Sequence, residues 1–102
     1  MNLGKAIKEL RRHKGISQKE LATRCGISTN AICSLENNDS FPSKNTFEKI
    51  CKALGIPGAY IFLFSISEEE IPERKRELYK LFIEQPLKEL VLEDMREESP
   101  NH

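Results

Sequence analysis

The sequence predicts an all-helical protein. Glycine and proline fall between segments in which apolar residues recur at helical spacing, and no segment alternates apolar and polar residues cleanly enough for a β-strand. At 102 residues the chain has room for one compact domain with an extension, but not for that domain joined to a separate ligand-sensing domain.

The first two helices are predicted from apolar spacing and from their end signals. The first covers residues 3–13, and its apolar stripe consists of Leu3, Ile7 and Leu10. Its basic residues lie mostly away from that stripe: Lys5, Lys8, Arg11 and Arg12. Gly15 ends this helix. The second begins after Ser17, because Ser17 and Glu20 can form a capping box, and it stops near Gly26.

The third and fourth helices begin at serine caps. Ser28 is a good N-cap for a helix that reaches residue 36, and the asparagines at 37 and 38 tolerate the left-handed conformation of a helix end. After a loop with Pro42, the fourth helix runs from Ser43 as cap to about residue 54, where Gly55 ends it. Its expected buried residues are Phe47, Ile50, Cys51 and Leu54.

The rest of the chain is predicted to form a short apolar helix and a C-terminal arm. Pro57 suits the first position of the fifth helix, whose residues 60–64 are apolar on every side. A helix from Glu73 to Glu84 should turn Leu78, Leu81 and Phe82 inward, and Pro86 should break it before a last short helix over residues 87–95. The expected division is a five-helix domain (1–65), an acidic linker (66–72), a dimerisation or interaction arm (73–96) and a disordered tail (97–102).

The formal net charge of zero conceals two halves of opposite sign. Residues 1–64 contain ten Lys or Arg and five Asp or Glu, whereas residues 65–102 contain six and eleven. The division suggests that the first part meets a polyanion while the second stays away from it. A solvated acidic tail explains the same pattern equally well.

The cysteines and the apolar runs argue against a metal site and a membrane segment. Cys25, Cys33 and Cys51 show no CxxC spacing, and only His13 and His102 could join them as nitrogen ligands. Unpaired cysteines fit a reducing cytosol. There is no charged leader with an apolar core, and the longest apolar run is far shorter than the roughly 20 residues of a membrane span. We therefore expect a cytoplasmic protein.

Residues 18–37 have the spacing of two helices that cross at a wide angle through a short turn. Ala22 stands where the second helix touches the third, since a longer side chain would push the two axes apart. Gly26 occupies the turn, which needs a residue free to adopt positive φ. Apolar residues occupy the positions that must face the core: Leu21, Cys25, Ile27, Ile32 and Leu35.

The outer face of the third helix is small, polar and uncharged. Ile32 and Leu35 point toward the core, and the opposite side of the helix holds Thr29, Asn30, Cys33 and Ser34. A helix with a purely structural role would more often carry Lys and Glu outward. Short hydrogen-bonding side chains can approach base edges in the major groove, so the pattern favours a DNA-reading helix.

Over residues 3–64 the chain resembles the helix-turn-helix of the Cro and lambda-repressor type, also called the XRE family. The matching string is LRRHKGISQKELATRCGISTNAICSLENNDSFPSKNTFEKICKALGI. Its most specific parts are Ser17-Gln18, Leu35-Glu36-Asn37, Pro42-Ser43 and Ala53-Leu54-Gly55. The resemblance implies a five-helix lambda-repressor-like DNA-binding domain with a C-terminal helical extension.

The resemblance also implies roles for individual residues. Gln18 would touch a phosphate and brace the recognition helix, and Asn37 would contact the DNA backbone. Base contacts would come from Thr29, Asn30 and Ser34. Their chemistry suits this, because asparagine can pair bidentately with adenine and the threonine methyl can meet that of thymine. Glu36 resembles a position that supports the fold, so no contact role is expected of it.

Further candidates for the DNA-binding set come from the helix starts. Amide groups at the starts of the second and fourth helices, with Lys44, would bind phosphates. Ser28, at the start of the third helix, belongs to the same set. Cys33 lies on the reading face, either as a small neutral filler or as an oxidant sensor.

The loop after Asn37 departs from the family pattern. Family members often place Gly and then Lys or Arg there, whereas this chain has the sequence Asn-Asp-Ser at 38–40. Contact with the DNA backbone should be weaker there, since Asp39 would repel a phosphate. Either the loop tilts away from the DNA, or Lys44 and Lys19 make a larger share of the contacts with phosphates.

The main hypothesis is a sequence-specific transcription regulator, a repressor, that reads a palindromic operator in double-stranded DNA as a homodimer. The over-apolar fifth helix and the C-terminal segments suggest a dimer surface, and those segments either fold back over the fifth helix or exchange between subunits. The alternative is a protein-binding module, such as an antitoxin that sequesters a regulatory protein partner, or a purely architectural interaction protein. With no catalytic or phosphate-loop pattern in the sequence, we expect neither enzyme activity nor a cofactor.

Overall fold

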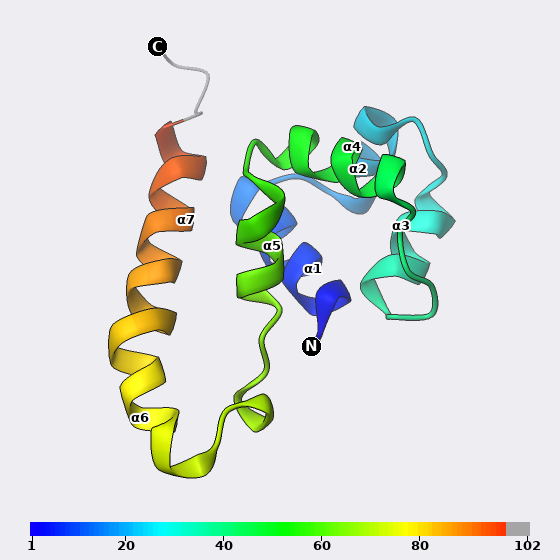
Figure 1. Ribbon diagram of the computed structural model, residues 1–102. Helices are drawn as coiled ribbons and strands as arrows, with labels where there is room; N and C mark the ends of the chain where they lie inside the picture. The colour runs from blue at the N-terminus through cyan, green and yellow to red at the C-terminus, as the bar shows by residue number, and fades with distance from the viewer. Residues whose placement is uncertain (98–102) are drawn as a thin grey trace.

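The computed structural model describes the backbone of residues 1–97 and the side chains of residues 1–93. This part of the chain is helical, as predicted, and contains no strand. Five helices form a bundle, and a long helical rod stands beside it (Figure 1). The bundle helices are α1 (Leu3–Lys14), α2 (Gln18–Cys25), α3 (Thr29–Glu36), α4 (Lys44–Leu54) and α5 (Gly58–Phe64). The expected disordered tail lies outside the described residues, apart from its first residue, Glu97.

Polar caps begin the first four helices, and those at Ser17, Ser28 and Ser43 were predicted. Each serine hydroxyl accepts a hydrogen bond from the backbone N–H three residues on, at 3.0 to 3.2 Å. Asn2 caps α1 in the same way. Only half of the predicted capping box forms on α2, because the Glu20 carboxylate lies toward Arg24. Pro57 was predicted as the first residue of the fifth helix, but it is the N-cap of α5, one position before the helix begins.

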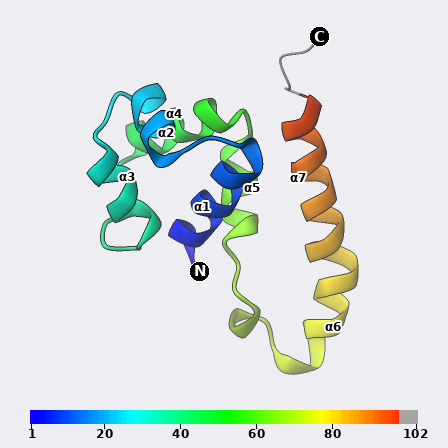
Figure 2. The ribbon, with the colours of Figure 1, turned by 180° about the vertical axis from the view of Figure 1, so that it is seen from behind.

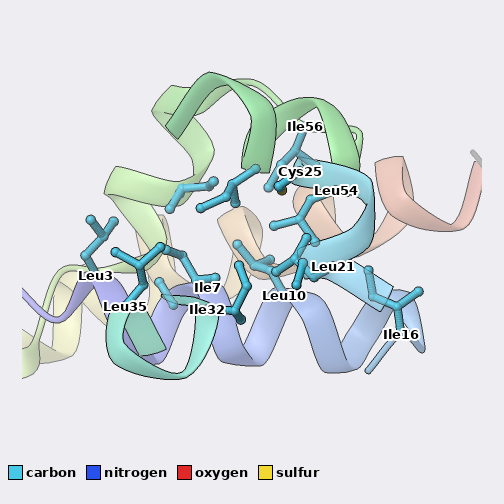
Figure 3. Close-up of a cluster of buried hydrophobic side chains, with 14 of the residues drawn as sticks. Leu3, Ile7, Leu10, Ile16, Leu21, Cys25, Ile32, Leu35, Leu54 and Ile56 are labelled. Atoms are coloured by element: carbon cyan, nitrogen blue, oxygen red, sulfur yellow. The ribbon is translucent and has the colours of Figure 1, made fainter. Parts of the chain in front are cut away.

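The core of the bundle forms where the apolar stripe of α1 meets α3, α4 and α5 (Figure 3). Leu10, Leu21, Ile32 and Leu54 are fully buried. Each such side chain contributes about 1.5–3 kcal/mol when it is removed from water, so these contacts dominate the stability of the bundle. The predicted core of α4 is confirmed for Ile50 and Leu54, whereas Phe47 and Cys51 are only partly buried.

The acidic segment between the bundle and the rod contains a short helical turn. Residues 68–70 form η1 (Glu68–Glu70), which is closed by a capping box between Ser67 and Glu70. The Ser65 carbonyl accepts a hydrogen bond from the Asn2 N–H at 2.7 Å, so the segment is also tied to the start of α1. The sequence predicts only a linker here.

The C-terminal rod is one continuous helical segment, and the predicted break at Pro86 is wrong. It consists of η2 (Glu73–Lys75), α6 (Arg76–Tyr79), the π-helical turn η3 (Lys80–Glu84) and α7 (Gln85–Glu97). A proline in a regular α-helix loses one hydrogen bond, and its ring clashes with the carbonyl four residues earlier. Here a wider turn precedes it, in which the Gln85 N–H donates to the Lys80 carbonyl. This local widening lets the helix continue through Pro86.

The rod folds back over the bundle within the same chain. In Figure 2, as in Figure 1, α7 lies alongside α5 and α1, and both pairs are in contact. Val91 is fully buried in this contact, and Leu87 is partly buried against the same core; Tyr79, on α6, is 8% exposed. The prediction that Leu78, Leu81 and Phe82 point inward is wrong, since all three are more than half exposed. The side of α7 that packs against the bundle carries Leu87 and Val91.

Candidate nucleic-acid interface

The turn between α2 and α3 has the geometry that the sequence predicts. Ala22 is 2% exposed at the contact between the two helices. Gly26 ends α2 with φ of 68°, a left-handed conformation that favours glycine. The Ile27 N–H then bonds to the Ala22 carbonyl at 3.0 Å, and Ser28 starts α3 at once. The short turn therefore holds the two helices at a close crossing.

The outer face of α3 is free of charged side chains. Thr29 and Asn30 are exposed in the first turn, while Cys33 and Ser34 are half-buried along the same side of the helix. The inward side chains are Ile32 and Leu35, as predicted. An α-helix with small hydrogen-bonding side chains on its exposed side can enter the major groove without steric or electrostatic conflict.

Several of the candidate side chains already have hydrogen-bond partners. The Ser28 hydroxyl accepts from the Ala31 N–H, so its main contact is the cap of α3. The Ser34 hydroxyl donates to Ser40 Oγ at 3.1 Å, which ties α3 to the loop after it. Asn37 is exposed, and its amide donates to Cys33 Sγ at 3.5 Å. Thr29 and Asn30, by contrast, are exposed in the first turn of the helix.

A buried ionic network lies directly behind this face. The Glu36 carboxylate, at the last residue of α3, accepts from Arg11 Nε at 2.7 Å and from Arg11 Nη2 at 3.1 Å. Gln18 Nε2 donates to the same carboxylate at 2.9 Å, and Arg11 Nη1 donates to the Ile16 carbonyl at 2.9 Å. Among the described side chains, no buried polar atom lacks a hydrogen-bond partner. The network connects α1, the start of α2 and the end of α3.

This network gives Gln18 a bracing contact and corrects the placement of Arg11. The sequence analysis places Arg11 among basic residues outside the apolar stripe, but the residue is 7% exposed. The burial of Arg11 had one signal in the sequence: it is a basic residue directly after Leu10, at the edge of the apolar stripe. Glu36 is a structural residue, as the resemblance implies, because its carboxylate is held inside the domain.

A second contact ties the end of α3 to the start of α1. Asn38 adopts φ of 61°, the left-handed conformation predicted for this pair of asparagines, whereas Asn37 does not. Asn38 Oδ1 accepts a hydrogen bond from the Gly4 N–H at 2.9 Å, and Asn38 Nδ2 donates to Asn2 Oδ1 at 2.7 Å. A side chain at Gly4 would meet the backbone carbonyl oxygen of Glu36 at 2.5 Å, so only glycine allows this approach. The sequence analysis did not predict this contact of Asn38 with Asn2 and Gly4, which we call the clamp.

The remaining basic candidates lie at helix starts. Lys44 is exposed as the first residue of α4, at the far end of the loop that begins at Asn37. Lys19 is exposed in the first turn of α2. Both sit where free backbone amides and the helix dipole favour a phosphate. Asp39 is exposed in the loop, and its N–H bonds to the Ser34 carbonyl at 2.9 Å.

The cysteines differ in their surroundings. Cys25 is buried in the core, and burial raises the pKa of its thiol; burial also raises the pKa of the Cys51 thiol. Burial therefore favours the protonated thiol at both positions. In the described part of the chain, no group of His, Cys, Asp and Glu side chains is arranged to hold a metal ion. None of the described helices combines the length and apolar character of a membrane span.

Comparison with known proteins places this geometry in a family. A helix-turn-helix family model matches residues 7–61, which include α2 and α3. Multiprotein-bridging factor 1 of Debaryomyces hansenii is 38% identical over 56 residues, which cover 55% of this chain and 37% of that protein. The HTH-type transcriptional regulator PuuR of Escherichia coli is 31% identical over 70 residues, which cover 69% of this chain and 36% of the regulator.

A shorter relative matches over most of its length. The cryptic phage CTXphi transcriptional repressor RstR of Vibrio cholerae is 31% identical over 85 residues, which cover 81% of this chain and 75% of the repressor. The chain thus spans little more than a third of the bridging factor and of PuuR, but three quarters of RstR.

Proposed function

The chain belongs to the XRE family of helix-turn-helix proteins, of the Cro and lambda-repressor type, and we propose that it is a DNA-binding transcription regulator. More specifically, it acts as a repressor that reads a palindromic operator as a homodimer. The repressor role is suggested by the name of RstR, of which the chain covers three quarters. A dimer is favoured because one recognition helix reads too few base pairs for useful specificity.

The observation that carries the proposal is the uncharged, exposed face of α3 on a braced scaffold. Thr29 and Asn30 extend from the leading end of the helix. At the other end of the helix, Glu36 is held by Arg11 and Gln18 through three hydrogen bonds. Side chains that read bases must be held in a defined position, since hydrogen bonds to base edges are directional. This domain provides that rigidity.

In the proposed complex the candidate residues divide into two groups. Thr29, Asn30 and Ser34 read base edges, while Cys33 fills the groove beside them. Backbone phosphates are bound by the starts of the helices and the loop after α3, with side chains from Gln18, Ser28, Asn37 and Lys44.

A pair of alanine substitutions distinguishes the residues that read bases from those that bind phosphates. Asn30→Ala should cost about 1–3 kcal/mol of binding free energy for each half-site and relax the preference at one base position in each half. Lys44→Ala should weaken binding to all sequences alike and reduce the magnitude of the slope of log K against log salt by about one for each half-site. Fluorescence anisotropy with cognate and random duplexes at several salt concentrations measures both.

The matched control is Asn45→Ala, which makes the same substitution at an exposed asparagine of α4. It should leave the base preference unchanged. If Asn30→Ala weakened cognate and random DNA equally, Asn30 would not read a base.

A further inference from the structure

One flank of the C-terminal rod is apolar along the length of the helix. Leu78, Phe82, Pro86 and Leu90 recur every four residues, a spacing that places neighbours on the same side of a helix. All four are exposed, Phe82 to 72%, so nothing in residues 1–93 covers them. A contiguous apolar row on a helix is the usual mark of a surface that binds another protein.

The other sides of the rod are different in character. Val91 is buried against the bundle with Leu87 partly buried beside it, whereas Leu81 and Ile83 are 53% and 47% exposed. Lys80 pairs with Glu68 at 2.8 Å, and Lys88 lies 3.4 Å from Glu84, so a second flank is charged. The apolar flank is therefore a distinct surface, and it is separate from the face by which the rod docks on its own bundle.

The charges along the rod suggest what covers this flank. Its start is more basic than acidic, with Arg74, Lys75 and Arg76 against two glutamates, while Lys80 is already paired with Glu68. Its later part is mainly acidic, with Glu84, Glu89, Glu93, Asp94 and Glu97 against two basic residues. Two such rods attract each other when they run antiparallel and repel when they run parallel, because like charges then meet.

We propose that this apolar flank binds a second copy of the chain, with the two rods antiparallel about a two-fold axis between Phe82 and Pro86. Leu78 then packs against Leu90 of the second copy, and Leu90 against its Leu78, as a two-fold interface requires. The basic start of each rod lies beside the acidic end of the other. The inference rests on the proposed function, since it names the surface by which the regulator dimerises.

The position of the rod leaves the reading face free. Both views place α7 on one side of the bundle and α3 on the other (Figures 1 and 2). A contact between two rods therefore does not cover α3.

The apolar row is tested by a charge placed at its centre. Phe82→Glu should raise the dimer dissociation constant of the full chain at least a hundredfold, measured by analytical ultracentrifugation. The matched control is Phe41→Glu, because Phe41 is 71% exposed in the loop before α4, remote from the rod. A monomeric parent chain, an unchanged dimer in Phe82→Glu, or an equal loss in Phe41→Glu would overturn the proposal.

The antiparallel order is tested by charge reversal at exposed residues, which leaves the packed faces untouched. One variant carries Arg74→Glu with Lys75→Glu, and the other carries Glu89→Lys with Glu93→Lys. Each alone should dimerise at least tenfold more weakly than the parent, since like charges then meet. Mixed in equal amounts, the two should form a heterodimer tighter than either homodimer, and added salt should reduce the difference. Failure to form that heterodimer would contradict the antiparallel arrangement.

Binding to a single half-site separates this inference from the proposed function. If the monomeric Phe82→Glu chain binds a half-site duplex with sequence preference but the parent chain is also monomeric, the interface is wrong and DNA reading stands. If the parent dimerises and the variants behave as stated, but no sequence is preferred, the interface stands and the proposed function is wrong.

Discussion

Replacing Arg11 with methionine should remove about 3–5 kcal/mol from the free energy of unfolding. The guanidinium makes two hydrogen bonds to Glu36 and one to the Ile16 carbonyl, and the two side chains are 9% and 1% exposed. Methionine keeps much of the apolar stem, but it leaves the Glu36 carboxylate buried with Gln18 as its neutral partner. Since a small domain is stable by only about 5–15 kcal/mol, this is a large share of the total.

Urea denaturation at neutral pH, followed by circular dichroism, measures the loss. Arg12→Met is the matched control, because Arg12 is exposed and its replacement should change stability by less than about 0.5 kcal/mol. The double variant Arg11→Met with Glu36→Leu should recover most of the loss, because both charges are then gone. The reasoning would be refuted by a loss below about 1 kcal/mol for Arg11→Met, or by a double variant no more stable than the single one.

Three further predictions concern the clamp, the rod and the linker. Gly4→Ala should destabilise the chain by about 1–3 kcal/mol, because the new methyl group meets the Glu36 carbonyl oxygen at 2.5 Å; urea denaturation measures this. Val91→Ala should cost about 2 kcal/mol in the same assay, since the side chain is fully buried between rod and bundle. The Lys80 ammonium holds the pKa of Glu68 below its usual range, so their ion pair should persist at neutral pH and be lost as the pH falls through that lowered value; carboxyl NMR of the parent chain and of Lys80→Gln follows it.

Each of these has an outcome that contradicts it. Unchanged stability in Gly4→Ala would mean that α1 does not approach α3 so closely. A cost below about 0.5 kcal/mol for Val91→Ala would mean that the rod is not part of the folded core. An ordinary pKa for Glu68 in the parent chain, equal to that in Lys80→Gln, would rule out the ion pair.

The bundle was predictable because its signals are local in the sequence. Ser17, Ser28 and Ser43 each cap a helix through a bond three residues away. Gly26 ends α2 through its own backbone conformation. The exposed side of α3 follows from helical periodicity once Ile32 is placed in the core. Such features need no knowledge of distant contacts.

What the sequence did not predict depends on contacts between distant residues. Arg11 meets Glu36 across 25 positions, and Gly4 meets Asn38 across 34. Leu78 and Phe82 have the spacing of residues on one apolar face of a helix. This spacing alone does not show whether that face packs against the bundle or stays exposed. The break at Pro86 was predicted from the rule for a regular helix, and the π-turn before it removes the conflict.

The proposal of a sequence-reading regulator is tested most directly by selection from a pool of random duplexes with the full chain, followed by sequencing. We expect recovery of an inverted repeat whose half-sites lie a whole number of helical turns apart, each turn being about 34 Å. The Asn30→Ala variant should recover the same repeat with one position in each half relaxed. Selection that enriches no sequence, with binding that falls with salt alike for every duplex, would contradict the account.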